Sequence, residues 1–222
     1  MNWTFLEYFD LVGTIAFAIS GAFVGIRKKM DIFGVVVLAI TTACGGGLIR
    51  DLIIGNNPPR MFRDPFYVMV AAVIGIIVFA VMYKHGTMPA KIHAIYDQML
   101  FWFDTLGLAA FTVDGVMIGV GAGYGPNKFL IVFLGFMTGV GGGALRDIMA
   151  DQMPDIFVKH IYALASIAGG ITMTFIFGLL HSWQPAMIGG FITVILVRFL
   201  AARYNWNLPK VRDVKTRSEN KK

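Results

Sequence analysis

The chain has 222 residues, of which 57% are hydrophobic and only 14% are charged, and its formal net charge is +6. Soluble domains carry about 25% charged residues, so this composition excludes an ordinary soluble enzyme and indicates a protein that lies in a lipid bilayer. The positive residues sit at the ends of apolar segments and in the terminal tail. An anionic membrane surface accounts for that placement better than a nucleic acid does.

Seven apolar segments are long enough, or nearly so, to cross a bilayer as helices of about 20 residues. In chain order they are Phe5–Ile26, Phe33–Ile54, Phe66–Val81, Ile95–Val120, Lys128–Ala150, His160–Leu180 and Met187–Ala202. Clusters of glycine, proline, asparagine and charged residues separate them, as turns require. The pattern predicts an all-α polytopic membrane protein with a basic tail from residue 204.

Lysine and arginine placement predicts the orientation. Loops on one side hold only Arg60, Arg63 and Lys128. The opposite loops and the tail hold Arg27, Lys28, Lys29, Lys84, Lys91, Lys159, Arg203, Lys210, Arg212, Lys215, Arg217, Lys221 and Lys222. Cytoplasmic loops carry the excess of positive residues. We therefore expect a protein of the inner membrane with its N-terminus outside and its C-terminus in the cytoplasm.

One motif occurs twice within the apolar segments. The first copy consists of Gly45, Gly46, Gly47, Arg50 and Asp51, and the second of Gly141, Gly142, Gly143, Arg146 and Asp147. Matches beyond the motif pair Asp10 with Asp104, Ser20 with Asp114, and Tyr67 with Tyr162. Spans one to three therefore correspond to spans four to six, and the seventh is an addition.

A unit of three spans is odd, so the second copy must enter the membrane from the opposite face. The sequence thus predicts an inverted repeat of the kind that builds permeation sites near the middle of the bilayer. The predicted units are residues 1–90, residues 91–183, a seventh helix at 184–203 and a cytoplasmic tail at 204–222. In this arrangement Arg50 lies on the outer side of its glycines and Arg146 on the inner side of its own.

The glycine triplets admit two interpretations. Each glycine weakens a helix by roughly 1 kcal/mol relative to alanine, so a triplet favours a break that exposes backbone carbonyls to a wet cavity. Non-helical backbone is tolerated at that depth only where protein or water covers it. Alternatively, the small residues allow two helices to approach closely. We expect the breaks.

The buried charges also admit two interpretations. Adjacent residues on a helix point about 100° apart, so we expect each arginine to pair across the repeat, or with Asp10, Asp104 or Asp114, rather than with its neighbour. The pairs form either a packed ion network or a charged gate. A lone carboxylate within a span is functional by default, so we expect Asp114 and the carbonyls of the glycine region to contact a passing cation, while the arginines hold the shape of the gate. Asp10 and Asp104 are expected to cap helix starts.

The doubled motif on spans two and five resembles the prokaryotic relatives of the trimeric intracellular cation (TRIC) channels, which are also catalogued as glycine transporters. The resemblance implies a homotrimer with one pore per protomer, framed by kinked second and fifth helices, and passage of monovalent cations such as potassium. Membrane lipids and those cations are the expected partners, and neither a resident metal ion nor a cofactor is expected. A secondary transporter of glycine or a similar small amino acid is the alternative, and a scaffold without transport is a third. The residues offer no nucleophile with a general base, so we do not expect an enzyme.

Overall fold

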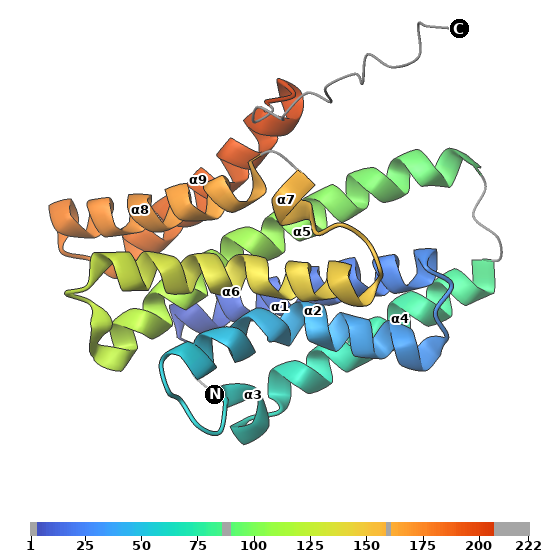
Figure 1. The fold of residues 1–222 in the computed structure, drawn as a ribbon. Coiled ribbons are helices and arrows are strands. Elements are labelled where there is room, and N and C mark those ends of the chain that lie inside the picture. The colour runs from blue at the N-terminus through green and yellow to red at the C-terminus, as the bar shows by residue number, and fades with distance from the viewer. Residues whose placement is uncertain (1–3, 86–89, 159–160, 207–222) are drawn as a thin grey trace, which may run out of the picture.

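The structure is a computed structural model that describes residues 4–85, 90–158 and 161–206. Its long helices are α1 (Phe5–Arg27), α2 (Ile32–Ile53), α4 (Phe66–His85), α5 (Ala90–Gly119), α6 (Lys128–Met149), α8 (Tyr162–Leu180) and α9 (Trp183–Arg203) (Figure 1). Its short elements are α3 (Arg60–Arg63), the π-helical turn η1 (Val120–Tyr124) and α7 (Asp155–Val158). Within the described residues there is no strand, and 7 helices are long and apolar enough to cross a membrane. The predicted all-α architecture with seven spans is therefore confirmed.

Local signals fix where these helices begin. The Asp31 side chain accepts a hydrogen bond of 2.8 Å from the Gly34 N–H at the start of α2, and the Asn127 side chain accepts one of 3.0 Å from the Leu130 N–H at the start of α6. Both are N-caps, which satisfy a backbone donor that has no partner within the helix. The two caps occupy equivalent places in the repeat.

The seventh helix is longer than its apolar stretch predicts. It begins at Trp183 rather than at Met187. Pro185 does not prevent this, because a proline in the first turn removes an N–H that would lack a helical partner anyway. The third span likewise runs on to His85. The predicted start of the sixth span at His160 and most of the predicted tail, at 207–222, lie outside the described residues. The division into units stays a prediction.

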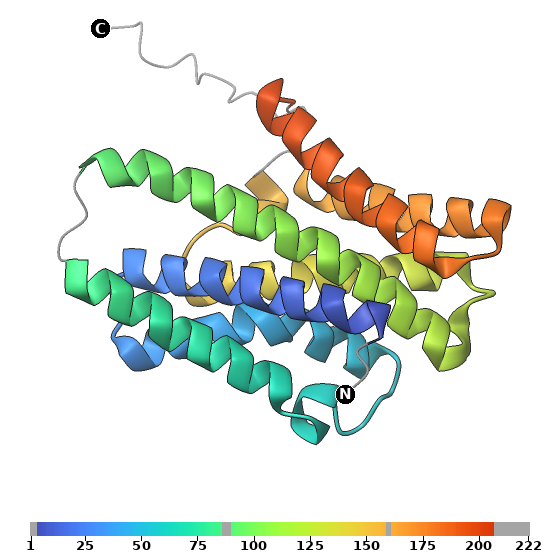
Figure 2. The same cartoon turned by 180° about the vertical axis from the view of Figure 1, so that it is seen from behind.

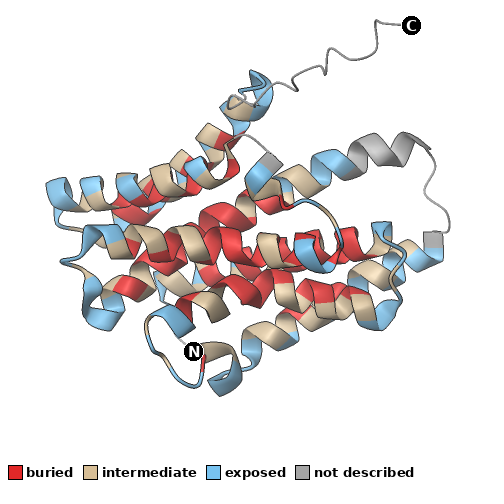
Figure 3. Cartoon of the chain, in the orientation of Figure 1, coloured by how far each residue is buried: buried red, intermediate tan, exposed pale blue. Residues whose placement is uncertain are grey.

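The helices form two groups of three with one helix added. Helices α1, α2 and α4 pack on one another, as do α5, α6 and α8, and α9 lies against α8 and α5. Figure 2 shows α1 between α4 and α5. Buried residues concentrate in α1, α2, α5 and α6 (Figure 3), whereas α4, α8 and α9 are less buried. Exposed apolar side chains such as Met69, Val73 and Ile76 on α4 suit contact with lipid.

The two groups meet where α2 crosses α6. A Cβ atom added at Gly45 would lie 2.7 Å from Leu145, and one added at Gly141 would lie 3.1 Å from Ile49. Residue numbers therefore rise along one helix as they fall along the other, so the helices are antiparallel. This is the relation that an inverted repeat requires.

Candidate functional site

The glycine triplets do not break their helices. Both α2 and α6 are continuous α-helix through the glycines. A Cβ atom at Gly46 would lie 2.0 Å from the carbonyl oxygen of Thr138, and one at Gly142 would lie 2.0 Å from that of Thr42. The expectation of unwound backbone is therefore wrong, because the carbonyls of the glycine region lie within α-helices. The expected contact of those carbonyls with a passing cation stays a prediction.

Close packing is the physical reason for the glycines. Without side chains there, the backbones of α2 and α6 touch, as small residues allow between membrane helices. We call this contact, made by Gly45, Gly46, Gly141 and Gly142, the glycine crossing. Since a Cβ atom would already collide with backbone, the crossing leaves no room for an ion in this conformation.

Two phenylalanines fill the centre beside the glycine crossing. The rings of Phe17 on α1 and Phe111 on α5 meet edge to face, with centroids 5.3 Å apart, and both are buried. Gly13 and Gly107 make room for them, since a Cβ atom at Gly107 would lie 2.0 Å from the Phe17 ring. This pair was not among the predicted site residues. The spacing that relates Asp10 to Asp104 also relates Phe17 to Phe111, and that signal could have found it.

The first charged cluster consists of Arg50, Asp51, Asp114, Asp10 and Arg60. Arg50 Nη1 lies 2.6 Å from Asp114 Oδ2, and Arg50 Nε donates a hydrogen bond of 3.0 Å to Asp51 Oδ1. The backbone N–H of Arg60 donates one of 2.7 Å to Asp51 Oδ2, and Arg60 Nη1 lies 3.3 Å from Asp10 Oδ2. The cluster thus ties α2 to α5, α3 and, through Asp10, α1.

A cavity of about 50 Å³ opens beside the first cluster. Its charged lining residues are Asp10, Arg50, Asp51, Arg60, Asp64 and Asp114, and its lining also includes Cys44, Tyr67, Phe111 and Thr138. Asp64 is exposed, so the cavity reaches the surface beside α3. Asp114 Oδ1 is buried and accepts no hydrogen bond from the described residues. A buried carboxylate oxygen without a donor is costly, and a cation in the cavity would supply what it lacks.

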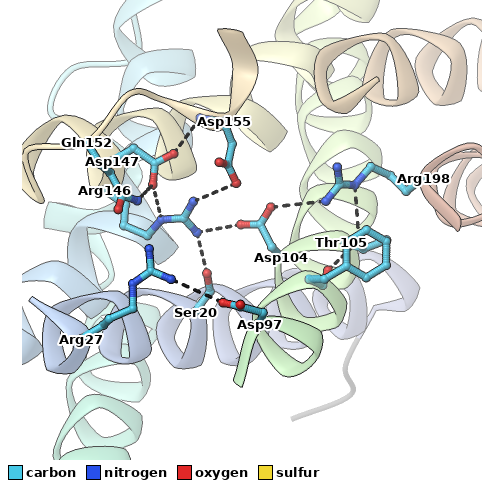
Figure 4. A network of polar contacts seen from close by, with 11 residues as sticks. Ser20, Arg27, Asp97, Asp104, Thr105, Arg146, Asp147, Gln152, Asp155 and Arg198 are labelled. Carbon is cyan, nitrogen blue, oxygen red and sulfur yellow. Dashed lines mark hydrogen bonds and ion pairs between the residues drawn. The ribbon is translucent and has the colours of Figure 1, made fainter. Parts of the chain in front are cut away.

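The second charged cluster consists of Arg146, Asp147, Asp104, Asp155 and Arg198 (Figure 4). Arg146 Nη1 lies 2.7 Å from Asp104 Oδ1, and Arg146 Nε donates a hydrogen bond of 2.8 Å to Asp147 Oδ1. The backbone N–H of Asp155, the first residue of α7, donates one of 2.9 Å to Asp147 Oδ2. The N–H of Arg60, the first residue of α3, makes the equivalent bond in the first half. Arg146 Nη1 also donates to Ser20 Oγ at 2.5 Å. The Arg146 side chain is only 1% exposed.

Arg50 pairs across the repeat with Asp114, as expected, and Arg146 pairs with Asp104, one of the three expected aspartates, within its own half. The expectation that neither arginine pairs with its own neighbour is wrong. A guanidinium group is a broad fork, so its Nε turns to the adjacent aspartate while its Nη1 reaches the neighbouring helix.

The predicted capping roles of two aspartates are also wrong. Asp104 lies well inside α5, and the N-cap of α1 is Thr4 rather than Asp10. Both carboxylates face arginines instead, Asp104 that of Arg146 and Asp10 that of Arg60.

Helix α5 supplies a partner to both arginines of the repeated motif. Asp104 and Asp114 are ten residues apart on α5, so the two charged clusters are separated by about 15 Å along its axis. Phe111, and Gly107 with the Phe17 ring against it, lie between them on the same helix. Two charged levels therefore enclose an apolar one.

Each charged cluster contains three carboxylates and two guanidinium groups. When all are ionised, each cluster has a formal charge of −1. Each cluster therefore has one carboxylate more than its two guanidinium groups neutralise.

Fold and site together define a polytopic membrane protein whose inverted halves enclose a charged interior. A family model described as glycine transporter matches residues 7–83 and 101–178, which carry the two copies of the repeat. The chain belongs to this family. The UPF0126 membrane protein of Deinococcus radiodurans is 36% identical to it over 92% of this chain and 91% of that relative. The UPF0126 inner membrane protein YadS of Escherichia coli K12 is 36% identical over 91% of this chain and 94% of that relative.

Solved structures share the fold. The TRIC trimeric intracellular cation channel orthologue from Rhodobacter sphaeroides superimposes with a TM-score of 0.81 at 29% identity, covering 92% of this chain and 100% of that one. A chain solved to explain conductance through TRIC cation channels gives a TM-score of 0.79 at 32% identity, covering 94% and 98%. The predicted resemblance is therefore confirmed, and the chain has the fold of the prokaryotic TRIC channels.

Proposed function

We propose that the chain is a potassium-permeable channel for monovalent cations in the inner membrane, a homotrimer with a separate pore in each protomer. The similarity to structures of cation channels supports this proposal. The observation that carries it is the pair of charged clusters, each with a surplus carboxylate, at two levels of one protomer's interior. The proposed path runs from the cavity past Asp114, between α2 and α6, to Asp104.

The proposed gate opens when α2 and α6 move apart at the glycine crossing. Arg50 and Asp51 are both on α2, whereas Asp114 is on α5. Movement of α2 away from α5 breaks the pair between Arg50 and Asp114 but leaves the guanidinium neutralised by Asp51. Asp114 then becomes available to a partly dehydrated cation. Arg146, Asp147 and Asp104 are arranged for the same exchange in the second half.

The positive-inside rule supports an external N-terminus and a cytoplasmic tail. With that orientation the cavity beside the first cluster faces outward and the second cluster lies toward the cytoplasm. Anionic lipids on the cytoplasmic side are the partners that the basic loops favour.

Potassium flux into liposomes that hold the purified protein tests the proposal. We expect flux that addition of glycine does not inhibit, and steady unitary currents in planar bilayers. Asp114→Asn should alter the currents, whereas the matched variant Asp97→Asn, at an exposed carboxylate paired with Arg27, should not. Absence of flux from protein that remains folded and monodisperse would remove the channel assignment.

A carrier of glycine is the second candidate, and the description of the family model favours it. The cavity presents groups of both charges, since Arg60 could bind a carboxylate while Asp114 binds an ammonium. Saturable glycine uptake without unitary currents would support this candidate. If neither potassium flux nor glycine uptake is detected, a scaffold without transport is the remaining candidate.

A further inference from the structure

Each half of the molecule has an aspartate and a tyrosine at equivalent places, and in each half one arginine contacts both of them. In the first half, Arg60 Nη1 lies 3.3 Å from Asp10 Oδ2, and the Arg60 guanidinium lies over the Tyr67 ring at 5.4 Å from its centroid. Arg60 comes from the short helix α3, and its side chain is 35% exposed.

In the second half the same two places are served from a different element. Arg198 Nη2 lies 3.9 Å from Asp104 Oδ2, and its guanidinium lies 4.8 Å from the centroid of the Tyr162 ring. It also lies 4.9 Å from the Phe101 centroid, and its Nε donates a hydrogen bond of 3.3 Å to Thr105 Oγ1. Figure 4 shows Arg198 and Arg146 approaching Asp104 from opposite sides.

Arg198 belongs to α9, the helix that has no counterpart in the repeat. Its side chain is 6% exposed. A charge so deep in a membrane protein is expensive and is retained where it has a use. Here its two stacked rings, its hydroxyl partner and its carboxylate partner fix it in one position, and that position faces the carboxylate that holds Arg146.

We propose that Arg198 is a positioning residue that holds Asp104 for Arg146, so that α9 locks the second charged cluster and leaves the first one unaffected. The inference rests on the proposed gate. Asp104 has one carboxylate oxygen toward each arginine, Oδ1 toward Arg146 and Oδ2 toward Arg198. Removal of Arg198 frees the carboxylate to rotate, which weakens the pair with Arg146 and opens the second half. Movement of α9 would do the same, and this gives the added helix control over one end of the path.

Two thiols at equivalent places can report the two halves separately. Cys44, the only cysteine of the chain, lines the cavity beside the first cluster. Val140 is the matching residue of the second copy, is 3% exposed and packs in the same buried group as Tyr162. The Val140→Cys variant in a Cys44→Ala background therefore reports the second half, and the natural thiol reports the first.

The experiment measures the rate at which a water-soluble cationic methanethiosulfonate modifies each thiol in the full-length protein in liposomes, by intact mass. We expect Arg198→Gln to raise the rate at the introduced thiol about tenfold and to leave the rate at Cys44 unchanged. Arg198→Lys keeps the charge but not the planar fork, so it should fold readily and give a smaller rise with the same selectivity. Arg203→Gln, at an exposed arginine on the last turn of the same helix, should change neither rate.

An equal rise at both thiols would mean that Arg198 supports only the general stability of the fold, and no rise at either would mean that it does not hold Asp104; both results overturn the inference. The corresponding variant of the first half, Arg60→Gln, should raise the labelling rate at Cys44 and leave the rate at the introduced thiol unchanged. Because labelling is independent of conduction, a selective rise in protein that conducts no potassium would uphold the positioning role of Arg198 while removing the channel assignment.

Discussion

The two charged clusters begin from the same motif and end in different environments. In each, an arginine binds the aspartate that follows it, and that aspartate accepts a backbone N–H from the next short helical element. Around Arg50 lies a cavity that reaches the surface, with Asp114 Oδ1 lacking a hydrogen bond from the described residues. Around Arg146 the partners are more numerous and the side chain is 1% exposed. The motif therefore determines the bond between each arginine and its adjacent aspartate. The neighbouring helices determine which cluster is accessible from the surface and which is locked by further partners.

The difference originates at one pair of equivalent residues. The first half of the repeat has Ser20 where the second has Asp114. As a result α5 carries the carboxylates that hold both arginines, and α1 contributes only a hydroxyl to Arg146. This asymmetry places the ion pair between the two halves, that of Arg50 with Asp114, beside the cavity.

The glycine crossing is shared by both halves, so its disruption should have the largest effect and the same effect from either side. Gly46→Ala and Gly142→Ala each place a Cβ atom 2.0 Å from a backbone oxygen. We expect each to cost at least about 3 kcal/mol, the upper end for overpacking, because backbone cannot move aside as a side chain can. Thermal unfolding in detergent measures the cost. Gly178→Ala, where nothing lies within 4 Å, is the control and should be neutral or slightly stabilising.

The next effect should separate the clusters. Arg146→Gln removes the guanidinium group that Asp147 and Asp104 share and leaves uncompensated negative charge in a buried site, at a cost of about 3–5 kcal/mol. Arg50→Gln should cost clearly less, because the cavity can admit water to Asp51 and Asp114. Unfolding midpoints of the two variants, measured side by side, check this order. Equal losses would contradict the distinction between an accessible cluster and a locked one.

Asp114→Asn should change conduction with little effect on stability. It changes the formal charge of the first cluster from −1 to zero, so cations should be less concentrated there, and unitary conductance should fall at least about twofold at 0.1 M salt. The loss should diminish at 1 M salt, where the Debye length is about 3 Å. A reduction that is independent of salt would show that the carboxylate acts through packing rather than through its charge.

The smallest effect on stability is expected at Arg60. Its side chain is one-third exposed, and its pair with Asp10 is long. Exposed pairs contribute about 0.2–1 kcal/mol, so Arg60→Gln should shift the unfolding midpoint only slightly. Arg198→Gln, at the buried counterpart, should shift it more. A larger shift for Arg60→Gln than for Arg198→Gln would contradict the view that Arg198, and not Arg60, is the arginine held firmly in place.

Much of the fold follows from the sequence because lipid imposes simple rules. Length, hydropathy and the duplicated motif were sufficient to predict seven spans and an inverted repeat, since helices must satisfy their own backbone in the bilayer. The glycine triplets were interpreted wrongly because helix propensity is a local property. Contact with a second helix at Thr42 and Thr138 outweighs it, and the sequence does not state which helices touch.

The sequence pointed to several residues of the candidate site but not to all of the ion pairs and hydrogen bonds between them. The doubled motif pointed to Arg50, Arg146 and Asp114, and each arginine was expected to pair across the repeat or with an aspartate of spans one or four. The bond of each arginine to its own neighbour was missed, since it depends on the orientation of the guanidinium fork. Arg198 was missed as well, because it lies outside the repeat and no spacing relates it to Asp104.

A direct test of the central claim is potassium flux through liposomes while Cys44 is modified by a cationic methanethiosulfonate. Cys44 lines the cavity beside Asp114, so a fixed positive charge there should block the proposed path. We expect the flux to fall in step with modification of the thiol, and Cys44→Ala to make the flux insensitive to the reagent. Complete modification with undiminished flux would contradict a path through this cavity.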